Sequence, residues 1–136
     1  MQRRGFSLPE TLIIGAITVL LAVVGTGLLA LERARLRDAK RITDMTIFAG
    51  AFAILYAQHG GYEQAANGCS KIGSNPASCT LPGVSATNEA MQDPGTFSYT
   101  ISRVPDHQDF AITFQLERNY GSLAAGKHVL SRQGVR

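Results

Sequence analysis

Two kinds of side chain in this sequence could do chemistry: an isolated carboxylate and a pair of cysteines. Glu10 stands directly before residues 11–31, a run of 21 residues without a charged side chain. A carboxylate within a membrane segment costs on the order of 3 kcal/mol, so such a residue indicates a function by default. The cysteines, Cys69 and Cys79, lie ten residues apart in the polar half of the chain.

The cysteine pair predicts a disulfide. Cys69 and Cys79 lie in a stretch rich in Gly, Ser and Asn, which suits one bridge in an oxidising compartment. The chain-entropy model gives about 2.8 kcal/mol of stabilisation for so short a loop. A zinc site would need more ligands than two thiols, and no histidine stands at ligand spacing nearby. Free thiols are the alternative.

The other polar residues form no catalytic or metal-binding pattern. No serine stands in a Gly-x-Ser-x-Gly context, and the sequence has no phosphate-binding loop. Three histidines lack a metal-binding neighbour three or four residues away on a predicted helix: His59, His107 and His128. We therefore expect no enzymatic activity, no metal and no cofactor. Calcium is the alternative, because four carboxylates of undiagnostic spacing could supply oxygen ligands: Glu89, Asp93, Asp106 and Asp109.

A long apolar segment must position Glu10. The chain has 136 residues, enough for one domain and an appendage. As a helix, residues 11–31 would span roughly 32 Å, close to the hydrocarbon thickness of a bilayer. This length predicts a membrane helix and argues against a purely cytosolic enzyme. A secretory signal peptide fits less well, because the apolar run is too long for one and Leu29-Ala30-Leu31-Glu32 at its end is a poor cleavage site.

The N-terminal residues resemble a known processing signal. Gly5-Phe6-Ser7-Leu8-Pro9-Glu10 follows a leader with two arginines and precedes about 20 apolar residues. This pattern resembles the prepilin signal of type IV pilins and type II secretion pseudopilins. The resemblance implies that a membrane peptidase cuts between Gly5 and Phe6 and methylates the new amine of Phe6. Glu10 then stands where the family carries its glutamate. Pro9 departs from the usual apolar residue, but proline is tolerated in the first turn of a helix.

The resemblance implies a structural subunit of a filament. We expect assembly through Glu10 and the apolar helix into a type IV pilus or a type II secretion pseudopilus; the sequence does not separate major pilin, minor pilin and pseudopilin. The implied partners are prepilin peptidase, the inner-membrane assembly platform, membrane lipid, and other copies or other pilin subunits. The implied location is the cytoplasmic membrane, with the rest of the chain outside the cytoplasm. The alternative is a monomeric, membrane-anchored, extracytoplasmic binding domain.

The net charge of +3 does not indicate a nucleic-acid partner. Without the first five residues, which hold Arg3 and Arg4, 11 basic side chains remain against 10 acidic ones. The basic run at residues 33–41 could contact DNA along a filament, but it lacks interleaved aromatic residues. We interpret this run as a solvated helix face at the membrane exit.

The helix is predicted to continue to about His59. Residues 32–58 contain no proline, and Gly60-Gly61 supplies a stop signal. Apolar residues recur at helical spacing and predict one buried stripe, with the charged residues on the other faces: Ile42, Met45, Phe48, Phe52 and Leu55. Residues 38–45 followed by Gly60-Gly61-Tyr62 are similar to the pseudopilin pattern in which this helix ends at a Gly-Tyr turn.

The remainder predicts a loop and a sheet. Residues 60–95 are rich in Gly and Pro and predict a long connection, with a short helical turn around residues 86–92 as an option. Alternation of apolar and polar residues predicts strands at 97–102 and 110–116, joined by a hairpin loop at 104–109, and a weaker strand at 127–131. The expected fold is therefore α+β, with one long helix on a small antiparallel sheet. The expected parts are a leader (1–5), a membrane and assembly helix (6–31) and a head (32–136). The core of the head is expected to come from five aromatic side chains: Phe48, Phe52, Phe97, Phe110 and Phe114.

Overall fold

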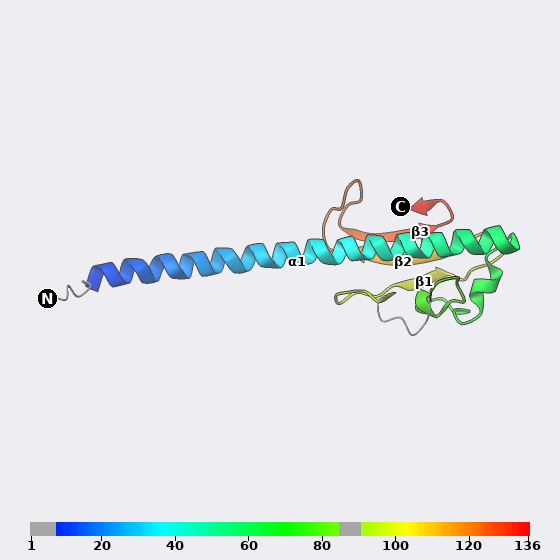
Figure 1. Cartoon of the computed structure of the whole chain (residues 1–136), viewed down its shortest axis with the longest axis horizontal. Helices are drawn as coiled ribbons and strands as arrows, with labels where there is room; N and C mark the ends of the chain where they lie inside the picture. The colour runs from blue at the N-terminus through cyan, green and yellow to red at the C-terminus, as the bar shows by residue number, and fades with distance from the viewer. Residues whose placement is uncertain (1–7, 85–90) are drawn as a thin grey trace. The chain divides into compact units, whose positions relative to one another are not determined.

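A computed structural model describes residues 8–84 and 91–136 of the chain. It confirms the α+β architecture expected from the sequence, in which an apolar N-terminal helix packs on a small antiparallel sheet. The elements in chain order are α1 (Leu8–His59), η1 (Glu63–Ala66), η2 (Pro76–Ser78), β1 (Thr100–Arg103), β2 (Ala111–Leu116), β3 (Gly126–Ser131) and β4 (Gly134–Val135) (Figure 1). The predicted leader and the junction of Gly5 with Phe6 lie outside the described residues.

The chain divides into two compact units. The first ends at Ala34, and the second, which we call the globular unit, comprises Arg35–Arg136. Within the described residues, α1 is long and apolar enough to cross a membrane by length and composition. The most apolar stretch of this helix is not buried within the chain, unlike a core helix of a soluble protein.

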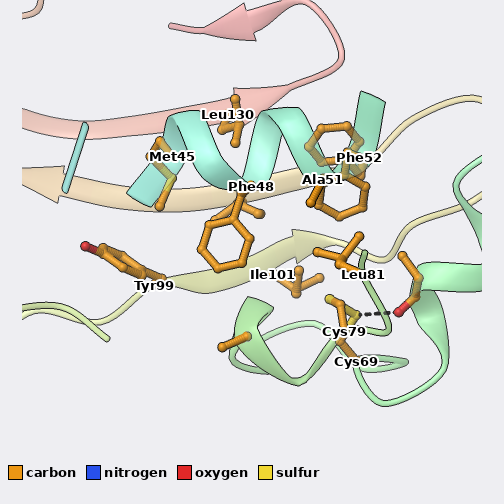
Figure 2. Close-up of a cluster of buried hydrophobic side chains, with 14 of the residues drawn as sticks. Met45, Phe48, Ala51, Phe52, Cys69, Cys79, Leu81, Tyr99, Ile101 and Leu130 are labelled. Carbon is orange, nitrogen blue, oxygen red and sulfur yellow. Dashed lines mark hydrogen bonds between the residues drawn. A yellow bond between two sulfur atoms is a disulfide. The ribbon is translucent and has the colours of Figure 1, made fainter. Parts of the chain in front are cut away.

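The second half of α1 packs on the sheet of the globular unit. The four antiparallel strands are ordered β1-β2-β3-β4. Alternate side chains of β2 are buried, namely Ile112, Phe114 and Leu116. They join the buried stripe of α1 in one apolar cluster, where Phe48 is fully enclosed (Figure 2). The stripe predicted from helical spacing is therefore confirmed, with Ile42 at its partly buried edge.

Aromatic side chains fix the end of α1. Gly60 has a φ of +74°, a left-handed conformation that ends a helix at little cost for glycine. The chain then turns, and Tyr62 becomes buried at 5.0 Å from the ring of Phe110. The Phe110 ring stacks on Phe52 of α1 at 3.7 Å. The predicted Gly-Tyr turn is therefore confirmed, and it closes the core at this end.

The structure differs from the sequence prediction in three places. The predicted first strand begins three residues late, at Thr100, and Phe97 is only half buried, so it is not a core residue. Its ring lies instead 4.9 Å from the guanidinium carbon of Arg41. The connection 60–95 contains η1 and η2, and β4 was not predicted because it has only two residues. Residues 85–90 lie outside the described part, as does most of the optional turn around 86–92.

Candidate functional site

Glu10 lies in the first turn of α1, as the sequence predicts. Pro9 stands beside it within the helix, because a first-turn proline lacks only an N–H that would have no helical partner. The macrodipole of a helix favours a carboxylate at this end. Glu10 thus stands where an anion is tolerated at the edge of an apolar segment.

The apolar segment after Glu10 presents an open groove. Both small residues and larger apolar ones line it: Leu8, Thr11, Leu12, Gly15, Ala16, Val19, Leu20 and Val23. A Cβ added at Gly15 would meet no atom within 4 Å. Small residues let two helix backbones approach closely in lipid, where packing rather than hydrophobicity holds helices together. The first half of α1 therefore has a surface suited to a second helix.

The predicted disulfide is present. The sulfur atoms of Cys69 and Cys79 are 2.02 Å apart, and both residues are buried. Both cysteines belong to the apolar cluster, and the bridge lies near Leu81 and Ile101 (Figure 2). Within the loop that it closes, two backbone hydrogen bonds of 2.8 Å run between Ile101 of β1 and residues Gly73 and Ser74. The bridge therefore fixes a loop that covers the outer edge of β1.

A buried ionic cluster was not predicted from the sequence. Arg41 is fully enclosed, and Asp38 is 1% exposed. The Nη1 atom of Arg41 donates to Asp38 at 2.7 Å and to Glu117 at 2.8 Å, while Nε and Nη2 bind Asp93 at 2.6 and 2.8 Å. Arg37 adds two hydrogen bonds to Glu117, of 2.7 and 2.6 Å. The interpretation of residues 33–41 as a solvated face is therefore wrong for Arg41.

The cluster shifts the pKa values of Arg41, Glu117 and Asp93. Burial lowers the pKa of Arg41, but its hydrogen bonds to the three carboxylates outweigh this effect and raise the pKa. The hydrogen bond from Arg37, with a further one from Arg41, lowers the pKa of Glu117 to about 2. Burial raises the pKa of Asp93, but the bonds from Arg41 and from the Gly95 N–H overcome it, and the net shift is downward. All of these groups therefore stay ionised at neutral pH and act as structural links.

A second buried group lies one turn further along α1. Asp44 is also buried. Its carboxylate accepts a hydrogen bond of 2.8 Å from the hydroxyl of Tyr99 and another from the ammonium of Lys40. Burial, followed by this hydrogen bond, raises the pKa of Tyr99. Asp38 and Asp44 were expected on the faces of the helix outside the buried stripe, but both are buried. The local signal that sequence reasoning missed is the Asp38–Arg41 spacing of three, which places both charges on one helix face.

Of the carboxylates considered as calcium ligands, Asp93 lies apart from Asp106 and Asp109. Asp106 and Asp109 both bind Arg103 at the tip of the β1–β2 hairpin, whereas Asp93 lies at Arg41. Glu89 lies outside the described residues. In the described ranges, no group of three or more His, Cys, Asp or Glu side chains could hold a metal ion. The guanidinium groups of Arg37 and Arg41 are hydrogen-bonded to carboxylates of the chain.

Among the histidines, His107 lies 3.6 Å from Glu63 at the surface. His128 contacts the carbonyl of Ala124 at 2.7 Å. His107 lies in the hairpin between β1 and β2, whereas His128 lies within β3, opposite Phe114 of β2. No family model, curated protein or solved structure significantly matches the chain.

Proposed function

We propose that this chain is a structural subunit of a type IV pilus or a type II secretion pseudopilus. The observation that carries the proposal is the position of Glu10, in the first turn of a helix that continues into an exposed apolar stretch and then into a folded globular unit. An anchor needs only the apolar stretch, so a plain anchor gives no reason for the carboxylate. Filament assembly would pair the carboxylate with a cation of a neighbouring subunit.

The mechanism is an exchange of lipid contacts for helix contacts. Lipid tails are as apolar as leucine, so the gain on assembly must come from close packing and from polar pairing. The groove around Gly15 and Ala16 allows close packing. Glu10 would pair with the N-terminal ammonium of Phe6 in a neighbouring subunit, and this pairing would set the axial register of the subunits.

The proposal also assigns the processing partners and the location. Prepilin peptidase would cut between Gly5 and Phe6 and methylate the amine of Phe6, and an inner-membrane platform would lift the subunit into the filament. The globular unit would lie outside the cytoplasm. The disulfide supports this location, because such bridges persist in oxidising compartments and are rare in the cytosol.

Mass spectrometry of the mature protein tests the processing step. We expect a chain that has lost residues 1–5 and carries a methylated Phe6. Gly5→Leu should leave the leader in place, whereas Gln2→Leu, which changes the leader away from the junction, should be processed normally. An intact Met1 in assembled wild-type protein would contradict the proposal.

Fibre isolation separates the proposal from a monomeric, membrane-anchored binding domain. The proposed subunit should appear in sheared, pelletable fibres when its assembly machinery is present. A protein that stays in the membrane fraction under the same conditions, after cleavage has been verified, would favour the monomeric domain.

A further inference from the structure

The turn after η1 contains an asparagine followed by a glycine. Asn67 and Gly68 are both exposed. The fold requires glycine at position 68, because its φ is +103° and a Cβ there would stand 2.2 Å from the carbonyl oxygen of Ser78. The side-chain amide of asparagine is attacked most readily when glycine follows, because no side chain then hinders the next backbone nitrogen. The packing of this turn therefore places the least hindered nucleophile directly after Asn67.

The reaction open to this pair uses only its own atoms and water. The backbone nitrogen of Gly68 attacks the side-chain amide carbon, Cγ, of Asn67, so that an N–Cγ bond forms, the Cγ–Nδ2 bond breaks, and ammonia leaves with the displaced proton. Water then opens the cyclic imide at either carbonyl and gives aspartate or isoaspartate. Within residues 8–84 and 91–136, the N–H of Gly68 and the side chain of Asn67 have no hydrogen-bond partner in the chain. Neither group therefore has to give up a contact with these residues before the attack.

The backbone of Asn67 keeps this reaction from starting. Ring closure requires the Cβ of Asn67 and the nitrogen of Gly68 to be eclipsed about the Cα–C bond, and at the observed ψ of 106° they are far from eclipsed. Rotation of ψ would turn the carbonyl of Asn67, which accepts two hydrogen bonds from Thr80. These come from the backbone N–H at 3.1 Å and from Oγ1 at 2.6 Å. Thr80 therefore holds the pair in an unreactive conformation.

The disulfide keeps Thr80 beside Asn67. Asn67 lies two residues before Cys69, and Thr80 directly follows Cys79, so the bridge joins the two ends of this contact. The N–H of Thr80 also donates to the carbonyl of Ala65 at 3.1 Å. If the bridge were reduced, only these hydrogen bonds at the protein surface would hold the ends of the loop together, and such bonds are each weak in net terms.

We propose that Asn67-Gly68 is a latent site of spontaneous modification, which Thr80 keeps closed and which converts to aspartate and isoaspartate when the disulfide loop opens. Both products add a carboxylate, and isoaspartate also routes the main chain through the side-chain carbon. The carbonyl that Thr80 binds is then displaced, so the loop cannot close as before. Because the ammonia is lost, the change permanently marks a chain whose loop has opened. This chemistry needs neither a membrane nor a filament.

Peptide mapping of the full chain by mass spectrometry tests this site. The protein is kept in neutral detergent at neutral pH, and the asparagine, aspartate and isoaspartate forms of residue 67 are counted over time. The reference is the same chain unfolded in guanidinium chloride. One neutral hydrogen bond favours a closed state by a factor of about five, so the two bonds from Thr80 should make the native chain react more than about tenfold slower than the unfolded one. Addition of a reductant to the native chain should remove most of this protection.

Single variants assign the protection to Thr80. Thr80→Val removes the Oγ1 donor and keeps the shape of the side chain, so conversion should be about fivefold faster than in wild type. The matched control is Thr43→Val, which removes a bond of the same kind, from Oγ1 to the carbonyl of Ala39 in α1, and should leave the rate unchanged. Thr80→Ser keeps the hydroxyl and should react nearly as slowly as wild type.

Each outcome decides the matter. Slow conversion in the native chain that accelerates in Thr80→Val and under reductant, but not in Thr43→Val, supports the site. Equal rates in the native and unfolded chains overturn it, as does an absence of conversion in the unfolded chain or an equal rate in Thr80→Val and Thr43→Val. Unfolding midpoints measured in parallel identify a variant that does not fold. In that case wild type with and without reductant decides, because no acceleration by the reductant overturns the proposal. The assay needs neither cleavage nor fibres, so it can fail while the proposed function holds, and the reverse.

Discussion

The guanidinium of Arg41 binds the carboxylate of Asp93 through two hydrogen bonds, from Nε to Oδ2 at 2.6 Å and from Nη2 to Oδ1 at 2.8 Å. The two side chains are 0% and 1% exposed and come from positions 52 residues apart. Arg41 belongs to α1, whereas Asp93 belongs to the segment that leads to β1. This segment is therefore attached to the helix by buried charge, with Phe97 packed under the same guanidinium.

We expect Arg41→Met to destabilise the globular unit by about 3–5 kcal/mol, because removal of one member of a buried ionic cluster leaves unpaired charges inside. Asp38 and Asp93 would lose their guanidinium partner while buried at 1% exposure. The measurement is urea unfolding of the full chain in neutral detergent, followed by circular dichroism.

The matched control is Arg37→Met. The side chain of Arg37 is 32% exposed, and its partner Glu117 keeps the hydrogen bond from Arg41. Solvent screens a partly exposed pair of this kind, so we expect a much smaller loss than in Arg41→Met. Equal losses in Arg37→Met and Arg41→Met would contradict the buried cluster.

The sequence predicts the apolar part of this fold well, because periodicity reports burial directly. Met45, Phe48, Phe52 and Leu55 follow helical spacing, and each is buried. The strand at Ala111–Leu116 follows from alternation, whereas the strand at Gly126–Ser131 has a weaker sequence signal. The disulfide also follows from local composition, because ten residues of Gly-rich chain can bring two cysteines together.

Periodicity does not predict the ionic cluster, because it assigns charged residues to solvent. Arg41 is buried only because Asp93 and Glu117, 52 and 76 residues away in the chain, reach it. Arg41 also contacts the ring of Phe97, and this residue is not paired in the sheet, in which β1 begins at Thr100. Such long-range pairing has no local signature beyond the Asp38–Arg41 spacing.

We expect acid to remove stability that the carboxylates of the cluster contribute. The pKa of Glu117 is lowered from 4.5 to about 2 in the fold, chiefly by the hydrogen bond from Arg37. A lowered pKa means that the contribution is complete above about pH 4.5 and is lost as pH falls towards 2. Asp93, whose pKa is also lowered, acts in the same direction.

Urea midpoints between pH 7 and pH 2 measure this dependence, with Glu117→Gln as the comparison. The variant cannot ionise at this position, so it should be less stable than wild type at pH 7 and approach it near pH 2. A constant difference between the two proteins over this range would contradict the assignment of the pKa shift to Glu117.

We expect Gly68→Ala to destabilise the disulfide loop by about 3 kcal/mol. Gly68 has a φ of +103°, and a Cβ there would stand 2.2 Å from the carbonyl oxygen of Ser78. The backbone conformation alone costs on the order of 1–3 kcal/mol for a residue with a side chain, and the clash adds to it. Unfolding under non-reducing conditions measures the loss.

Gly73→Ala separates the two causes within the same loop. Gly73 also has a positive φ, of +90°, but a Cβ there would meet nothing within 4 Å. We therefore expect a smaller loss, from backbone strain alone. Losses of equal size would show that the contact with Ser78 adds nothing.

Glu10→Leu should reduce fibre formation while membrane insertion is kept or improved. Within the proposed filament, Glu10 is the one acidic side chain between residues 6 and 31, so no neighbouring carboxylate can replace it. The N-terminal ammonium of Phe6 in a neighbouring subunit would then lie unpaired in an apolar environment, which costs on the order of several kcal/mol. The globular unit should stay folded, because its core is built from other residues, Phe48 and Phe114 among them.

Glu32→Leu, which removes the carboxylate just after the apolar stretch, is the control and should assemble. The measurement compares membrane-fraction protein with sheared fibre for wild type and each variant. Normal fibre yield from Glu10→Leu as the only subunit would exclude the proposed role. Loss of membrane protein as well as fibre would indicate misfolding. In that case Glu10→Gln, which is closer in shape to the native side chain, tests the loss of charge separately.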